Sequence, residues 1–243
     1  MVNQMRLRHY ACVAALLVTA TALRAAPFQN LNFNTGTIHA APANYVPWDA
    51  VSPIDAVAAL PGWTAMEDTS IATALWGQNA ALDETFITLI RTNAIEGGRD
   101  IQLYSYIDAP SGYFHTASIS QTGDIPAVTN SIFFYIRTPA VGVGINPIPY
   151  VTLNGIPIVT FPVSNVGGIV EMQGDVTQFA GTTAHLTFEA AGISGSFPAS
   201  EDIFELDNIS FSPQPVPEPA TLMLAAPAVF LLRTRRDGRA TQA

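Results

Sequence analysis

The chain has 243 residues, a formal net charge of −9, no lysine and a single cysteine. An acidic surface repels nucleic acid and anionic lipid, which excludes nucleic acid as a partner. One cysteine cannot form a disulfide framework, so the fold must be held by its own core.

The first 26 residues have the layout of a secretory signal peptide. Arg6 and Arg8 supply a basic start, and an apolar stretch at 11–23 has the usual length and is followed by small residues suited to cleavage. The only cysteine, Cys12, lies inside this segment. We therefore predict a signal helix that engages the secretion machinery and is removed. The alternative is a buried N-terminal helix.

Residues 27–213 form the predicted body. These 187 residues suffice for one domain with its own core. Three arginines stand against 17 acidic residues here, which gives the body a net charge of −14. The segment is rich in Gly, Pro, Thr, Ser, Ile and Val, and helical periodicity is almost absent, so we predict an all-β fold.

Short runs of β-forming residues recur along the body, separated by Gly, Pro, Asn and Asp. We predict strands at 28–33, 85–91, 100–107, 113–121, 131–138, 150–153, 156–161, 166–172, 184–190 and 204–211. Asn154-Gly155 favours a type I′ hairpin turn, and Pro157 favours a sheet edge. The stretch 34–82 is less regular, and we expect loops there with one or two short strands and Trp63 in the core.

Several segments of the body resemble the galactose-binding-like jelly roll, a β-sandwich found in many carbohydrate-binding modules. They are the stretch 112–126 with the strand after it, a one-turn helix within 174–181 before the penultimate strand, the closing Glu205-Leu-Asp-Asn-Ile-Ser-Phe211, the opening Asn30-Leu-Asn-Phe-Asn34 and Leu60-Pro-Gly-Trp-Thr64. The resemblance implies a two-sheet antiparallel β-sandwich (jelly roll), flanked by the N-terminal signal helix and a short C-terminal hydrophobic helix.

The same resemblance implies a structural Ca²⁺ between the opening and closing strands. Asp207 matches the closing-strand acid, and Glu205 lies two residues earlier on the same strand face. Asn34 stands where the family commonly has a carboxylate, and its amide supplies an oxygen without a charge. The alternative is that Asp207 only caps or hydrogen-bonds the strand end.

Aromatic side chains are a second binding feature, because sugars stack on exposed tryptophan and tyrosine rings. The candidates for glycan contact are Trp48, Trp76, Tyr104, Tyr106 and Tyr113. Tyr104 and Tyr106 share one strand face, so they bind or are buried together. Burial in the core is the alternative for each candidate.

Motifs for catalysis are not found in the sequence. It contains no Gly-x-Ser-x-Gly, no His-x-x-His and no phosphate-binding glycine loop, and His39, His115 and His185 stand in separate segments. Adjacent acids such as Glu67-Asp68 would point to opposite faces if they were in a strand, and we expect these pairs in loops. Solvated loop charge therefore explains them better than paired glycosidase carboxylates. We therefore expect that the protein is not an enzyme.

Residues 214–243 form a tail of several parts in a fixed order. A proline-rich stalk leads into the motif Val216, Pro217, Glu218, Pro219 and Ala220, then an apolar segment at 220–232, then the basic cluster Arg233, Arg235 and Arg236, with Arg239 beyond it. A 13-residue helix reaches roughly 20 Å, short of the ~30 Å hydrocarbon core. Basic residues just past an apolar segment favour the cytoplasmic side.

This order resembles the PEP-CTERM sorting signal of Gram-negative bacteria that make extracellular polysaccharide. The resemblance implies a transient stay in the inner membrane and an exosortase-type enzyme that cuts near Glu218. The body would then reach the cell envelope, the cell surface or the extracellular matrix. An ordinary C-terminal anchor that is never processed is the alternative.

Together these features predict an exported, non-catalytic cell-surface or exopolysaccharide-matrix protein, with polysaccharide as a potential partner. A carbohydrate-binding adhesin is the first alternative, and a polysaccharide-active enzyme is the second.

Overall fold

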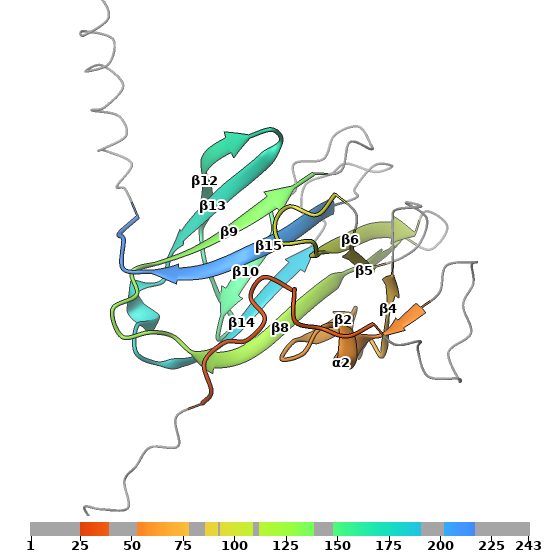
Figure 1. Cartoon of the computed structure of the whole chain (residues 1–243), viewed down its shortest axis with the longest axis horizontal. Helices are drawn as coiled ribbons and strands as arrows, with labels where there is room; N and C mark the ends of the chain where they lie inside the picture. Colours follow the sequence, from red (N-terminus) through yellow and green to blue (C-terminus); the bar gives the residue numbers. More distant parts are fainter. Residues whose placement is uncertain are drawn as a thin grey trace, which may run out of the picture.

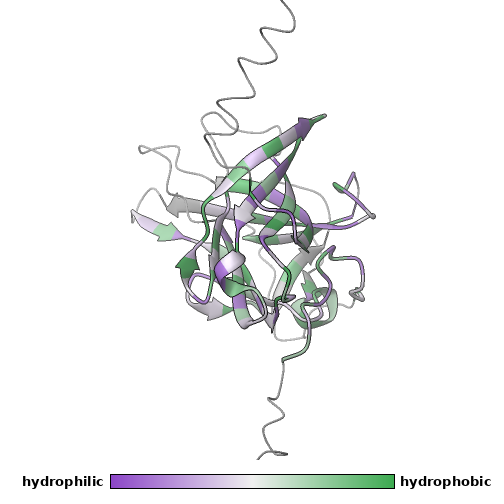
Figure 2. Ribbon diagram, turned by 90° about the vertical axis from the view of Figure 1, so that its left-hand side faces the viewer, coloured by the Kyte–Doolittle hydropathy of each residue, from purple (hydrophilic) through white to green (hydrophobic). Residues whose placement is uncertain are grey.

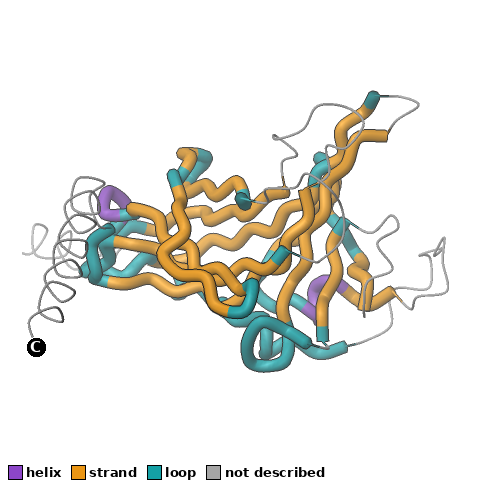
Figure 3. Tube along the Cα trace, turned by 90° about the horizontal axis from the view of Figure 1, so that it is seen from above, coloured by secondary structure: helices purple, strands orange, loops and turns teal. Residues whose placement is uncertain are grey.

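Fifteen strands in two sheets account for most of the computed structural model, which describes residues 25–38, 53–77, 86–91, 93–108, 112–138, 148–190 and 202–216 (Figure 1). Two short helical turns accompany them, α2 (Ala56–Ala59) and the 3₁₀ turn η1 (Thr177–Phe179). The two turns lie at opposite ends of the sandwich, as Figures 1 and 3 both show.

The larger sheet has nine strands and is built around the last strand of the described chain. Its order is β1 (Pro53–Asp55), β4 (Ala74–Gly77), β5 (Ile87–Ile90), β6 (Asp100–Asp108), β15 (Asp202–Ser212), β9 (Ser131–Arg137), β13 (Ile169–Asp175) and β12 (Thr160–Val166), and β7 (Tyr113–His115) pairs with β6. The pairing of β4 with β5 is parallel and the others are antiparallel.

The smaller sheet has six strands, and all of its pairs are antiparallel. Its order is β11 (Ile156–Pro157), β10 (Tyr150–Leu153), β14 (Thr183–Ala190), β8 (Ala117–Asp124), β2 (Thr64–Glu67) and β3 (Ser70–Ile71). Hydropathy changes along most strands in Figure 2, as expected where one face of a strand is buried and the other is not.

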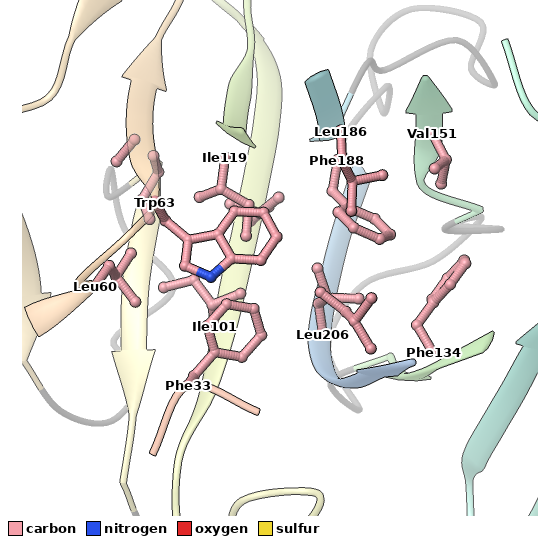
Figure 4. Packing of buried hydrophobic residues seen from close by; sticks show 14 of the residues in the cluster. Phe33, Leu60, Trp63, Ile101, Ile119, Phe134, Val151, Leu186, Phe188 and Leu206 are labelled. Atoms are coloured by element: carbon pink, nitrogen blue, oxygen red, sulfur yellow. The ribbon is translucent and has the colours of Figure 1, made fainter. Parts of the chain in front are cut away.

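The core lies between the two sheets and is aromatic at its centre. Phe134 of β9 and Phe188 of β14 meet edge to face with ring centroids 5.1 Å apart. Trp63 is also buried, and its indole N–H donates to the carbonyl oxygen of Asn30 at 3.1 Å. Figure 4 shows Trp63 and Ile119 opposite this part of the core. The prediction that Trp63 lies in the core is confirmed.

This arrangement confirms the predicted all-β, two-sheet β-sandwich. The two predicted flanking helices lie outside the described residues. Within the described ranges, no helix combines the length and apolar character needed to cross a bilayer.

The Asn154-Gly155 turn also forms as predicted. Both residues take positive φ angles, 52° and 75°, and Leu153 pairs with Ile156 across the turn. The resulting strand β11 contains Pro157 and lies at the edge of the smaller sheet, where the missing N–H of a proline interrupts no inner ladder.

The predicted strand at 28–33 is wrong. Asn30 and Phe33 take φ angles of 48° and 54°, and the Phe33 amide donates to the Asn30 carbonyl oxygen, so the chain turns here. Its apolar side chains pack against the core without the extended backbone that their spacing suggested.

The segment 34–82 contains more strands than predicted. Four short strands, β1 to β4, and the turn α2 lie within 53–77. Strands of two to four residues are too short to carry a readable alternation of polar and apolar side chains.

Candidate functional site

The point where the chain leaves the sandwich is the first candidate site. After β15 ends at Ser212, body side chains donate hydrogen bonds to three consecutive carbonyl oxygens: Asn130 to Pro213, Ser131 to Gln214 at 2.6 Å, and Gln173 to Pro215 at 3.5 Å. In Figure 1 this exit lies at the same end of the molecule as η1. We call these three contacts the strap.

The strap works through carbonyl groups because Pro213 and Pro215 have no N–H to donate. Ser131 is 0% exposed and Gln173 is 3% exposed, so two of the donors are buried beneath the stalk. Val216, the first residue of the predicted sorting motif, is half-buried. The stalk therefore lies on the sandwich as far as the motif and does not project freely from residue 213 onward.

A group of buried acids is the second candidate site. Asp100 of β6 is 0% exposed, and the two predicted residues of β15, Glu205 and Asp207, are 7% and 0% exposed. The side chain between them, Leu206, is in the core, so these acids belong to the outer face of the larger sheet. We call the three carboxyl groups and Arg137 the acid cluster.

The loop between β5 and β6 covers the acid cluster. The Ile95 amide donates to Asp100 Oδ2 at 2.9 Å, and the Glu96 amide donates to Asp207 Oδ2 at the same distance. Loop and strand are also joined side chain to side chain, because Asn208 Nδ2 donates to Glu96 Oε2 at 2.6 Å. Asp100 and Asp207 are thus buried, although they lie on the outer face of the sheet, because the β5–β6 loop covers them and its backbone N–H groups bind their carboxyl groups.

Arg137 is the cation of the acid cluster. It lies directly opposite Glu205 in the β9–β15 ladder, and its Nε donates to Glu205 Oε2 at 2.6 Å. Its guanidinium also comes within 3.6 Å of Asp100 Oδ2. Asp100 Oδ1 has no hydrogen-bond partner within the described part of the chain.

Burial dominates the titration of these acids. Burial, and then the neighbouring charge of Glu205, raise the pKa of Asp100 to about 8. Burial also raises the pKa of Asp207 to about 7, against the opposing effect of the amides of Asn208 and Glu96. The pKa of Glu205 is raised by burial too, although Arg137 opposes this. With a pKa of about 8, Asp100 keeps its proton at neutral pH.

These residues do not fit a Ca²⁺ ion. Glu205 is turned to Arg137, and both oxygens of Asp207 already accept backbone N–H groups, from Asn208 and Glu96. Asn34 lies beside Gly97, so close that a Cβ there would be 2.2 Å from its Nδ2. Among the described residues, no group of three or more His, Cys, Asp or Glu side chains is placed to hold a metal. A guanidinium supplies the positive charge that the calcium hypothesis assigned to an ion.

Sequence reasoning placed Glu205 and Asp207 on one strand face but missed Asp100 and Arg137. Both come from neighbouring strands that are distant in sequence. One signal was available for Arg137: it is one of only three arginines in the body, and it lies on a predicted strand. A cation in such a place needs a partner.

The predicted glycan-contact residues are described only in part, and Tyr104, Tyr106 and Tyr113 lie on the paired strands β6 and β7. Trp48 lies outside the described residues, and Trp76 and Tyr106 lie in β4 and β6 with side chains that are not described. Tyr104, also in β6, is half-buried.

Of the two candidates whose side chains are described, Tyr113 on β7 is the exposed one, at 53%. Its ring meets the His115 ring edge-on, with centroids 4.7 Å apart. His115 Nδ1 lies 3.0 Å from Asp68 Oδ2, and the Asp68 Oδ1 atom accepts the Thr116 amide at 2.8 Å. An exposed aromatic ring therefore stands beside a fixed histidine–aspartate pair.

Most of the sorting tail lies beyond the described residues. This applies to Pro217, Glu218, Pro219 and Ala220, and to the basic cluster Arg233, Arg235 and Arg236. Val216 is the member of the motif that the structure describes.

Comparisons with known proteins give no family. No protein-family profile matches the chain, and no curated protein matches it. Among solved structures, the chain is similar to a β-glucosidase from Kluyveromyces marxianus in complex with glucose (14% identity, TM-score 0.30, covering 82% of this chain and 19% of that one). A selenomethionine-labelled form of that enzyme gives 14% identity, a TM-score of 0.31 and coverage of 84% and 22%. The chain thus spans about a fifth of those structures, and a similarity at this level carries no argument about its function.

Proposed function

We propose that this chain is an exported, non-catalytic β-sandwich protein of the cell surface or exopolysaccharide matrix, sorted by its C-terminal PEP-CTERM-type signal. The observation that carries the proposal is the passage from β15 into the tail. The body holds the stalk carbonyls as far as Pro215, one residue before the motif begins at Val216. No free linker therefore separates the sandwich from the start of the sorting motif.

Each part of the chain has a role in this proposal. The N-terminal segment engages the secretion machinery. The apolar segment 220–232 then stays in the inner membrane, with Arg233, Arg235 and Arg236 on the cytoplasmic side. An exosortase-type enzyme cuts near Glu218 and releases the folded body to the surface.

The acid cluster supports the non-catalytic part of the proposal. A glycosidase needs two carboxyl groups that reach a substrate. Asp100 and Asp207 are both 0% exposed beneath the β5–β6 loop, so neither can touch a sugar without loss of the loop contacts. The cluster fastens the loop to the sheet.

The sorting proposal predicts that the motif is required for processing. We expect Glu218→Gln combined with Pro219→Ala to leave the chain at full length in the membrane fraction, because the processing enzyme no longer recognises it. Immunoblots of fractionated cells measure the ratio of full-length to shortened chain. Asp237→Asn is the matched control, because it removes an acid of the same tail beyond the basic cluster. Unchanged processing and surface delivery in the double variant contradict the proposal.

Contact with polysaccharide is the second candidate function, and the exposed ring of Tyr113 favours it. A flat apolar ring suits a sugar face, and the polar edge of the His115–Asp68 pair suits its hydroxyl groups. Such a shallow site gives weak binding that becomes useful through many contacts along a polymer.

This second function is tested with a glycan array and with purified exopolysaccharide. We expect Tyr113→Ala to lower the apparent affinity about five-fold or more, since a stacked sugar loses its platform. Tyr150→Ala is the matched control, because Tyr150 is a partly exposed tyrosine on the other sheet. An equal loss in both variants, or no binding by the parent chain, rules out the Tyr113 platform.

A further inference from the structure

The strap sets a short limit on how far the sorting motif can move from the body. Ala220, where the apolar segment begins, is five positions after Pro215, the last held residue. A fully extended chain of five residues spans at most about 17 Å. With the strap closed, the sandwich therefore lies within about 17 Å of the start of the membrane segment.

This distance leaves little room for an enzyme. The headgroup layer occupies roughly 5–7 Å on each side of the hydrocarbon core. A processing enzyme must fit around the motif in the space between the headgroups and the sandwich. With the strap closed, the sandwich bounds this space on one side. Opening the strap frees residues 213–215 and lengthens the reach by roughly 10 Å.

The strap is built to stay closed most of the time and yet to open. Ser131 and Gln173 are buried, so loss of the stalk carbonyls leaves polar groups without partners. The residues that they hold, Gln214 and Pro215, are exposed, so water can replace the body as their partner when the stalk lifts. Lifting breaks the three hydrogen bonds of the strap and exposes Val216, and β15 ends before the strap at Ser212.

We propose that Asn130, Ser131 and Gln173 are positioning residues that hold the stalk at 213–215 against the sandwich, directly before the sorting motif, so that strap opening limits the rate at which the membrane enzyme processes the chain. The inference rests on the proposed sorting function. It assigns a role to Asn130 and to the buried side chains of Ser131 and Gln173, whose donors are directed at the stalk.

The test is a pulse-chase measurement of processing in cells that make the full chain. We expect Ser131→Ala combined with Gln173→Ala to shorten the half-time of processing about two-fold or more, because the open stalk becomes more populated. Ser164→Ala is the matched control, since this exposed serine lies on β12 and bonds only to Glu171 among the hydrogen bonds described.

A second variant leaves the sandwich untouched. Insertion of Gly-Ser-Gly-Ser between Pro215 and Val216 lengthens the reach with the strap intact, and we expect the same acceleration. Unchanged or slower processing in both the double variant and the insertion overturns the inference. Failure of the sorting function itself is read separately, as normal processing of the Glu218→Gln, Pro219→Ala chain.

Discussion

Asp100 is the residue whose chemistry departs furthest from what its type suggests. Aspartate is rarely buried without a cation, and here the cation Arg137 is shared with Glu205. Asp100 keeps a proton at neutral pH as a result, because burial and the charge of Glu205 raise its pKa to about 8. The acid cluster therefore combines a protonated acid, Asp100, with an ion pair between Glu205 and Arg137.

The protonation of Asp100 predicts that stability depends on pH. Its pKa rises from the ordinary 3.8 of an aspartate to about 8 in the folded chain, so the folded state binds a proton that the unfolded state has released. This contribution to the free energy of unfolding is complete below pH 4 and is lost as the pH rises through 8. Asp207, with a pKa of about 7, adds to the loss in the same direction.

Asp100→Asn should flatten this profile. The amide keeps an oxygen for the Ile95 N–H, and it does not titrate. We expect the variant to lose less stability than the parent between pH 5 and 8, by an amount on the order of a few kcal/mol. Urea denaturation at several pH values measures it, with the exposed Asp175→Asn as control. Identical profiles for Asp100→Asn and the parent contradict the protonated state.

At the scale of elements, the sequence predicts the strands whose side chains alternate. In β14, Ala184, Leu186 and Phe188 are buried and their neighbours are more exposed, as a half-buried strand requires. The interruption in the alternation of β15 is also a physical feature. The register with β9 shifts between Asp207 and Ser210, and Asn208 takes a φ of 50°.

The elements that sequence reasoning missed or misread depend on contacts between residues that are distant in sequence. The turn at 28–33 is held by Gln121, whose side chain hydrogen-bonds to both the amide and the carbonyl oxygen of Gln29. The acid cluster likewise needs β6, β9 and β15 to be neighbours before Asp100 and Arg137 meet Glu205. A local pattern specifies which face of a strand is polar, but the partner across the ladder follows only from the topology.

At the scale of the whole molecule, negative charge is spread unevenly along the body. The run from Thr138 to Val170 has 33 residues without a charged side chain, and it contains β10, β11 and β12. The acids therefore crowd into the rest of the body. Its three arginines offset few of them, since Arg137 lies within the acid cluster and Arg99 donates to the Gly36 carbonyl oxygen.

This excess of negative charge predicts that salt stabilises the fold. A body with a charge of −14 repels itself more when it is compact than when it is unfolded. Raising NaCl from about 0.01 M to 0.5 M shortens the screening length from about 30 Å to under 8 Å. We expect the Tm of the purified full chain in non-ionic detergent to rise by about 2–5 °C over this range.

The stabilisation by salt should shrink near pH 4, where exposed carboxylates gain protons and the repulsion falls. The buried pair of Arg137 and Glu205 acts in the opposite sense, because salt weakens attraction as well as repulsion. Burial shields that pair from ions, whereas acids such as Glu96 and Asp175 are exposed to them, so the repulsive contribution decides the sign. A Tm that stays constant or falls with added NaCl at pH 7.5 would mean that ion pairs, and not self-repulsion, dominate the electrostatics of this sandwich.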